Sequence, residues 1–504
     1  MRWILLIVGV FGLCGSVTIA YWRQTNADVS PASMFLILVL LPSLVVGCVY
    51  GMYRLKKWLK ERDGAEQKNL QETVNQVPLA EGIAAPWLRV YATSVQTQLS
   101  DHADQIILGL QQFRTAECDA ELFNINGSRL LSRRIDLTLN NGISDSKSDV
   151  NIADTESLSM RARRIEALTQ NLYEQLDQTL ATICEGMTET HLWQQPTESH
   201  QAILHPAWQG KAVEEHFQPL IMEEKSIWPK FLKVLYLLPY HLGQDDLQYL
   251  QQVAYAQMIR YGFQAEQVQW VNHVAREPDD TLQQIGNAFA DQVASIEPLV
   301  LLILGADSHL DQDLVDGLVQ ENAKYIPAEA GFSILCSNEK MSVPSLPVLA
   351  QLTIPILIKR QKPINAGGQV GADELTEGLD ELRRIYPPHE ADFVPDAGIL
   401  ISDIHSAQST NLRELSRVLR PFDLPAEQVL YAGSLLENTD VMMSGVALAL
   451  ALQQAESSQL SVPVISSAGN VWRGLWLAAP YLQTPEFIEA SAESESIHQI
   501  SEHA

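Results

Sequence analysis

The sequence is poor in the residues that form disulfides, metal sites and nucleic-acid interfaces. Five cysteines among 504 residues show no paired spacing, which argues against a zinc site or a disulfide scaffold. Lysine and arginine number 34 against 61 aspartates and glutamates, giving a net charge of −27. A chain this acidic repels a phosphate backbone, so we expect no nucleic-acid partner. We also expect no metal and no cofactor: no metal-ligand spacing is present, and the glycine-rich segment 366–372 lacks the lysine of a phosphate-binding loop.

The charge is distributed unevenly along the chain. Residues 1–62 hold seven basic and two acidic residues, and the other 442 residues carry a net charge of −32. An acidic body is therefore joined to a basic, apolar leader. We do not expect this body to bind an anionic lipid surface by itself.

Two apolar runs in the leader predict a transmembrane hairpin. Residues 4–20 and 34–53 are each close to the ~20 residues that span a bilayer, and the polar linker 23–33 is short. Five basic residues follow between Arg54 and Arg62, which places this end in the cytoplasm. We therefore expect a two-pass protein of the inner (cytoplasmic) membrane with its body in the cytoplasm. A cleaved signal peptide is the alternative, and the second apolar run argues against it.

The rest of the chain divides by composition into four segments. A polar tether, 63–85, follows the membrane hairpin of residues 1–62. Two comparable halves follow, 86–340 and 341–482, and a polar, acidic tail closes the sequence at 483–504, where we expect disorder.

Apolar strands alternate with amphipathic helices in both halves, which indicates an α/β fold. In the first half we expect strands at 88–95, 129–139, 234–238, 268–271, 299–304 and 332–336. A helix over 281–295 is expected to begin at an acidic cap formed by Asp279 and Asp280. The second half repeats the alternation, with strands from 353–359 to 474–478. Strands that are apolar on both faces predict a largely parallel sheet with helices on both sides.

Five segments, in the right order, resemble the β-ketoacyl synthases of the thiolase-like superfamily. They are Leu88 to Leu99, Leu301 to Asp311, Tyr325 to Leu335, Gly433 to Leu450 and Ser466 to Leu475. The resemblance implies a duplicated α/β double domain with layered helices and mixed sheets, here preceded by the two-helix transmembrane hairpin.

The same resemblance implies that the synthase chemistry is missing. Those enzymes need a nucleophilic cysteine at a helix N-terminus, where the helix dipole lowers its pKa. The matching position falls near Pro278 to Thr281, and the residues there include Asp279 and Asp280 but no cysteine. The second active-site histidine matches Ser434, and only His405 matches the first. We therefore expect a degenerate site without catalytic residues.

Other chemically notable residues have ordinary structural interpretations. Cys184, Cys336 and His241 fit packing roles better than catalytic ones. The apolar-aromatic stretch with Trp228, Phe231, Tyr236 and Tyr240 is a candidate anchor for a partner protein. Packing into the core is the alternative for most of these aromatic side chains.

Three functions follow from these observations. The first is a membrane-anchored, non-catalytic adaptor that binds a protein partner; the chain is similar to degenerate thiolase-like adaptors that load lipase effectors onto type VI secretion machinery. The partner would then be a lipase effector or a component of the secretion machine, with self-association into a homodimer also open. The second is an acyl-transfer or condensing enzyme with a displaced nucleophile and His405 as base. The third is a non-catalytic protein that binds an acyl ligand.

Overall fold

Apart from Ser16, the residues that the computed structural model describes all belong to the unit that runs from Ile83 to Ala504. The described residues are 16, 86–112, 114, 116–124, 126–137, 139, 158–194, 226–321, 325–343, 345–360, 371–386, 399–405, 409–420, 428–436, 440–467, 469 and 471–481. The predicted hairpin (apart from Ser16), the tether 63–85, most of the glycine-rich loop and the tail 483–504 lie outside them. Within the described part, no helix combines the length and the apolar character needed to cross a bilayer.

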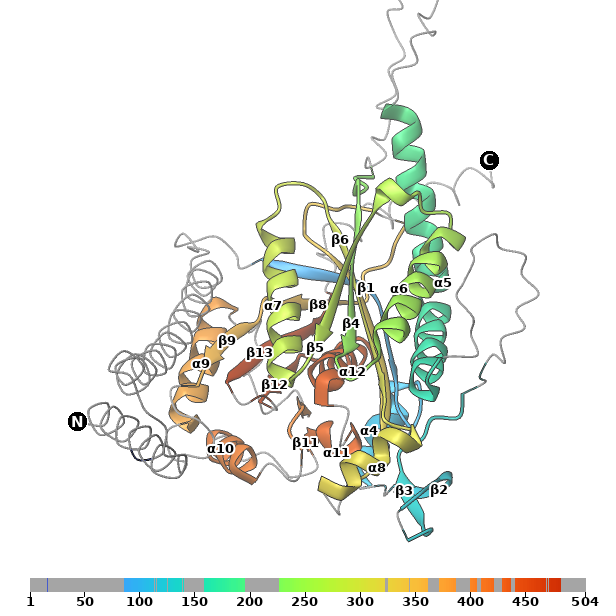
Figure 1. Cartoon of the computed structure of the whole chain (residues 1–504). Coiled ribbons are helices and arrows are strands. Elements are labelled where there is room, and N and C mark those ends of the chain that lie inside the picture. Colours follow the sequence, from blue (N-terminus) through green and yellow to red (C-terminus); the bar gives the residue numbers. More distant parts are fainter. Residues whose placement is uncertain are drawn as a thin grey trace, which may run out of the picture. The chain divides into compact units, whose positions relative to one another are not determined.

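The first half supplies five strands to one large sheet (Figure 1). In chain order they are β1 (Trp87–Gln96), β4 (Leu232–Pro239), β5 (Val268–Ala275), β6 (Val300–Ser308) and β7 (Glu329–Ser337). In space they run β5-β4-β6-β7-β1. Strand β4 is parallel to both of its neighbours, β5 and β6. Strand β7 is antiparallel to both of its neighbours, β6 and β1.

The second half repeats this arrangement. Its strands are β8 (Ala350–Thr353), β10 (Leu400–Ser402), β11 (Val429–Tyr431), β12 (Val462–Ser466) and β13 (Trp472–Pro480). They run β11-β10-β12-β13-β8, so both halves place their strands in the order third, second, fourth, fifth, first. An antiparallel pairing of β1 with β8 joins the two sets, and β9 (Ile356–Lys359) is added beside β13. The repeated order is the duplication that the sequence predicts.

The sheet is mixed, as the resemblance to the β-ketoacyl synthases implies, whereas the strand pattern alone predicts a largely parallel one. In each half the fifth strand runs against its neighbours, β7 in the first half and β13 in the second. An apolar strand that is buried on both faces reads alike in either direction, so the sequence pattern could not distinguish the two arrangements.

Helices cover the sheet and fill the space between the two strand sets. Helices α7 (Pro278–Ala294) and α12 (Met443–Ser458) contact each other and strands of both halves. Helix α12 is apolar around nearly its whole circumference, and so are the surroundings it packs into. Helices α5 (Met160–Gln194) and α6 (Gln244–Arg260) lie together beside the first strand set, with a second core between them and the sheet (Figure 1). The remaining helices are α4 (Ala103–Gln111), α8 (Gln312–Glu321), α9 (Gly371–Ile385), α10 (Ser409–Leu419), α11 (Gly433–Leu436), and the short 3₁₀ turns η4 (Ala265–Gln267) and η8 (Asp440–Met442).

Several element boundaries differ from the sequence prediction for identifiable reasons. Helix α7 begins at Pro278, whose fixed φ suits the first helical position, so Asp279 and Asp280 lie inside the first turn and are not caps. The strand predicted at 353–359 is divided into β8 and β9 around Pro355, which has no N–H for the sheet. Strand β6 continues past the predicted end at 304 to Ser308.

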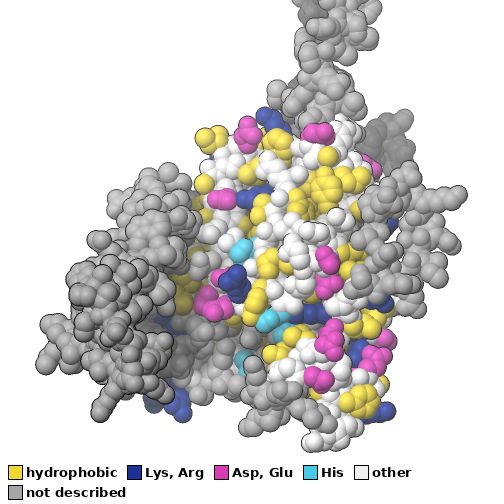
Figure 2. Space-filling model, viewed as in Figure 1, with side chains coloured by type: hydrophobic (Ala, Val, Ile, Leu, Met, Phe, Trp, Pro, Cys, Tyr) yellow, Lys and Arg dark blue, Asp and Glu magenta, His cyan; other side chains and the backbone are white. Residues whose placement is uncertain are grey.

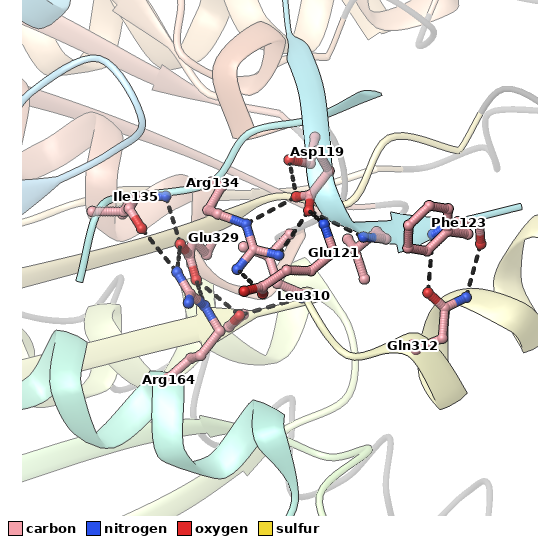
Figure 3. Close-up of polar contacts among 12 residues, drawn as sticks. Asp119, Glu121, Phe123, Arg134, Ile135, Arg164, Leu310, Gln312 and Glu329 are labelled. Atoms are coloured by element: carbon pink, nitrogen blue, oxygen red, sulfur yellow. Dashed lines mark hydrogen bonds and ion pairs between the residues drawn. The ribbon is translucent and has the colours of Figure 1, made fainter. Parts of the chain in front are cut away.

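A hairpin of β2 (Glu117–Phe123) and β3 (Arg129–Ser132) stands outside the main sheet, and polar contacts hold it together and join it to α8 (Figure 3). Asp119 accepts two hydrogen bonds from Arg134, at 2.9 Å each, and one from Ser132 at 2.5 Å. At its tip, the backbone N–H of Phe123 donates to Gln312 on α8, whose side chain donates back to the Phe123 carbonyl.

A buried ion pair anchors the segment that follows the hairpin. Glu329 at the start of β7 accepts bonds of 2.7 and 2.5 Å from the guanidinium of Arg164 on α5. The same carboxylate accepts the Ile135 backbone N–H at 2.6 Å, and Arg164 donates to the Ile135 carbonyl (Figure 3). Both side chains of the pair are almost fully buried. The pair thus neutralises its own charge and satisfies the backbone of a segment outside the sheet.

Candidate functional site

The candidate site lies where the first turn of α7 meets the connection from β12 to β13. Helix α7 follows the third strand of the first set, and the sequence resemblance places the missing nucleophile at its N-terminus. The side chain found there, Asp279, is buried. It accepts the backbone N–H groups of Val471 at 3.0 Å and of Trp472 at 2.7 Å. Its carboxylate therefore holds the start of β13 in place.

Asp280, the neighbouring acid, has a local role. It accepts the backbone N–H of Arg276 at 2.9 Å and is half-buried. A carboxylate in the first turn of a helix is stabilised by the helix dipole. Asp280 thus stabilises the backbone just before α7.

A second buried carboxylate holds the other end of the same connection. Asp403 follows β10 and is fully buried. It accepts the backbone N–H of Ser467 at 2.7 Å and the hydroxyl groups of Ser444, at 2.8 Å, and Ser466. Asp279 and Asp403 therefore fix opposite ends of the β12–β13 connection, one from each half of the chain.

The structure brings the remaining two predicted positions together through a close backbone approach. A Cβ at Gly433 would lie 2.6 Å from the carbonyl carbon of Ile404, so only glycine fits there. This contact sets the segment with Ser434 against the segment with His405. The Ser434 hydroxyl donates to the Tyr431 carbonyl at 2.7 Å, and the His405 side chain is half-buried.

An ionic cluster supports the β12–β13 connection from the second half. Arg360 donates to Ser467 at 2.9 Å, to Asn411 at 2.7 Å and to Glu414 at 2.9 Å. Glu414 also accepts a 2.6 Å bond from Arg473 on β13. Burial and the adjacent Arg360 lower the pKa of Arg473 to about 10. Ser467 is consequently held on both sides, by Asp403 and by Arg360.

The thiols of the described body are poor nucleophiles where they are buried. Cys336 on β7 is fully buried, and burial raises the pKa of its thiol well above the ordinary range. Burial also raises the pKa of Cys184 on α5. Cys118 on β2 is exposed. Since the thiolate is the reactive form, neither buried thiol is poised for attack.

The four candidate anchor aromatics are spread between core and surface. Tyr236 is fully buried on β4, where its hydroxyl lies 3.1 Å from that of Thr169, so it is not available to a partner. Trp228 is half-buried and packs against α5 at Gly186. Phe231 is half-buried, and Tyr240 is exposed and lies against His241. Only part of the set can therefore contribute to a contact surface.

The sequence did not indicate the residues that surround the carboxylates of Asp279 and Asp403. Ser444, Ser466 and Gly469 surround Asp403 and Asp279, yet they are separated from them by tens to hundreds of residues. The only local signal was Asp403 itself, an acid directly after an apolar strand. In the part of the chain that the structure describes, no three histidine, cysteine or acidic side chains form a group that could hold a metal ion.

Comparisons with known proteins find the ketosynthases. No family model and no curated protein matches the chain. Among solved structures, an ishigamide ketosynthase/chain length factor is 11% identical with a TM-score of 0.44, covering 79% of this chain and 100% of that one. A type II polyketide ketosynthase in complex with its acyl-carrier protein is 12% identical with a TM-score of 0.45, covering 78% and 99%. A ketosynthase of the bacillaene synthase from Bacillus amyloliquefaciens is 9% identical with a TM-score of 0.45, covering 79% and 76%. These proteins belong to the group that the sequence motifs resemble, and the likeness concerns the fold alone.

Proposed function

We propose that this chain is a non-catalytic protein of thiolase-like fold that acts as an adaptor for a protein partner. One observation carries the proposal: the side chain at the position matched to the nucleophile, Asp279, is buried and bonded to the backbone of Val471 and Trp472. A carboxylate held in this way offers no thiolate, and its charge would oppose the oxyanion that develops during acyl transfer.

The geometry around the other matched positions supports the same conclusion. Ser434 stands where the second histidine would act and is bonded to the Tyr431 carbonyl. Asp403 is close in sequence to His405, and its carboxylate accepts hydrogen bonds from two serine hydroxyls and a backbone N–H. These groups stabilise the β12–β13 connection, which is a structural role.

The competing enzyme hypothesis requires a displaced nucleophile. Cys336 and Cys184 are the buried candidates, and burial raises the pKa of both thiols. Nothing in their surroundings lowers it enough to favour the thiolate at neutral pH. The adaptor hypothesis therefore agrees better with the described residues.

We further propose that this adaptor loads an effector protein at a membrane. In this proposal the apolar runs 4–20 and 34–53 hold the acidic body at the inner membrane, and the partner is a lipase effector or a component of a type VI secretion machine. The support is the sequence resemblance and the basic residues between Arg54 and Arg62.

Affinity purification of the full chain from its native membrane tests this proposal. We expect a lipase and a secretion-spike protein to co-elute in fixed proportion with the full chain. A matched variant, Tyr240→Ala, tests whether the one exposed candidate aromatic contributes to the contact. Recovery of an acyl carrier protein in place of these partners would contradict the adaptor function and favour the enzyme.

A further inference from the structure

A second group of charged side chains lies at the carboxyl ends of β4 and β6, separate from the site above. Arg161 in the first turn of α5 donates a 2.8 Å bond to Asp307 near the end of β6. The other oxygen of Asp307 lies 3.2 Å from Nε2 of His309. The Nδ1 of that histidine lies 2.5 Å from the hydroxyl of Tyr325. The four side chains form one chain of contacts, from a buried guanidinium to a half-buried imidazole and a buried phenol.

Arg161 differs from the other buried arginine of the same helical turn. Arg164 donates two hydrogen bonds to the carboxylate of Glu329 and one to the Ile135 carbonyl. Arg161 has one bond from Nη2, and its Nε and Nη1 are buried without a hydrogen-bond partner. Its side chain is 4% exposed. Two unmade charge-assisted hydrogen bonds at a buried cation are costly, and each would be recovered by a suitable acceptor.

The local electrostatics favour a negative ligand. The first turn of α5 contains no acidic residue but carries Arg161, Arg163 and Arg164, although the N-terminus of a helix is already its positive end. Asp307 balances the charge of Arg161, and Glu329 balances that of Arg164. Asp311 accepts the backbone N–H of Arg161 at 3.4 Å, but its other oxygen caps α8 through the N–H groups of Asp313 and Leu314.

Two histidines, His241 and His309, lie near this group. Burial lowers the pKa of the His241 imidazole, and the nearby Arg161 and His309 lower it further, so this ring is mainly neutral at neutral pH. A neutral imidazole still supplies one N–H donor for an anion. On the face drawn in Figure 2, histidine side chains lie near both basic and acidic ones in the middle of the molecule.

We propose that Arg161 binds a small oxyanion, a carboxylate or a phosphate group, beside His241 at the carboxyl ends of β4 and β6. The guanidinium supplies Nε–H and Nη1–H donors to the anion while Nη2 remains on Asp307. His241 and His309 flank the bound group. This inference does not depend on the adaptor function, because none of these residues belongs to the degenerate site.

Titration calorimetry on the purified full chain tests the site, with inorganic phosphate and acetate as separate probes and chloride at matched ionic strength as reference. The key variant is Arg161→Lys, which retains the ion pair with Asp307 but loses the two unpaired donors. Arg163→Lys, in the same turn, is the matched control. We expect saturable binding of one probe, weakened about tenfold or more in Arg161→Lys and unchanged in Arg163→Lys.

The two probes and a second variant make the outcome decisive. Saturation by phosphate alone identifies a phosphate ligand, and saturation by acetate alone identifies a carboxylate. Should Arg161→Lys lose the wild-type circular dichroism spectrum, the exposed His241→Gln replaces it, with an expected weakening of a few-fold. Absence of saturable binding of both probes to the wild type, or equal affinity in the wild type and the folded variants, would overturn the proposal.

Discussion

The carboxylate of Asp279 accepts a 2.7 Å hydrogen bond from the backbone N–H of Trp472, joining the first turn of α7 to the start of β13. The bond links two halves of the chain. We expect Asp279→Asn to lower the free energy of unfolding by about 1–3 kcal/mol, because an amide keeps only one acceptor for the Val471 and Trp472 N–H groups. Chemical denaturation followed by circular dichroism measures the change. Asp280→Asn, which affects a single bond to Arg276, is the control and should cost less; an equal or larger loss in the control would contradict the clamp role of Asp279.

The thiols of the body should differ in reactivity. Cys118 is exposed, whereas Cys184 and Cys336 are buried with a raised pKa. We expect iodoacetamide at neutral pH to alkylate Cys118 in the native protein and to reach the other two only after denaturation. Peptide-resolved mass spectrometry distinguishes the sites. Stoichiometric alkylation of native Cys336 would show an accessible thiolate and revive the enzyme hypothesis.

Removing the counter-charge of Arg164 should be strongly destabilising. Glu329→Gln leaves a buried guanidinium without its carboxylate, and we expect a loss of about 3–5 kcal/mol in the free energy of unfolding. The control is Glu381→Gln, whose partner Arg384 is exposed on the same helix, and it should leave the denaturation midpoint unchanged. Similar midpoints for the two variants would rule out a stabilising role for the buried pair.

Acid should weaken the attachment of the β2–β3 hairpin. Burial alone would raise the pKa of Asp119, but hydrogen bonds from Arg134 and Ser132 outweigh it and lower the pKa from 3.8 to about 2. Because the folded-state pKa is the lower one, this carboxylate stabilises the fold above pH ~4, and the contribution disappears as the pH falls towards 2. The difference in unfolding free energy between the wild type and Asp119→Asn should therefore shrink over that interval. Glu121→Gln, at an exposed partner of Arg134, should show no such trend; a pH-independent difference for Asp119→Asn would contradict the ion-pair account.

The architecture of the body was largely predictable because apolar strands and amphipathic helices alternate visibly in the sequence. Strand β2 was missed for a physical reason: most of its residues are exposed, and its position depends on Asp119, Arg134 and Gln312, contacts that no local pattern encodes. Strand β6 extends through Asp307 and Ser308 because both polar side chains find buried partners, Arg161 and Glu329. These partners lie 146 and 21 residues away along the chain, and no local sequence pattern indicates them.

The sequence named candidate positions for the site but not the contacts that their side chains make. The resemblance located Asp279, Asp280, His405 and Ser434, and the absence of a cysteine was visible directly. The bond from Asp279 to β13 joins residues that are 193 positions apart, and the sequence pattern suggested only a helix cap. The function of the buried carboxylates emerged from tertiary contacts, as is usual for polar groups in a core.

Intact-mass spectrometry after incubation with an acyl-CoA tests the central claim, the absence of acyl-transfer chemistry, most directly. The purified full chain should keep its unmodified mass and release no free coenzyme A above the level of a heat-denatured sample. A stoichiometric acyl adduct that survives desalting and maps to Cys184, Cys336 or a residue of the α7 N-terminus would contradict the account.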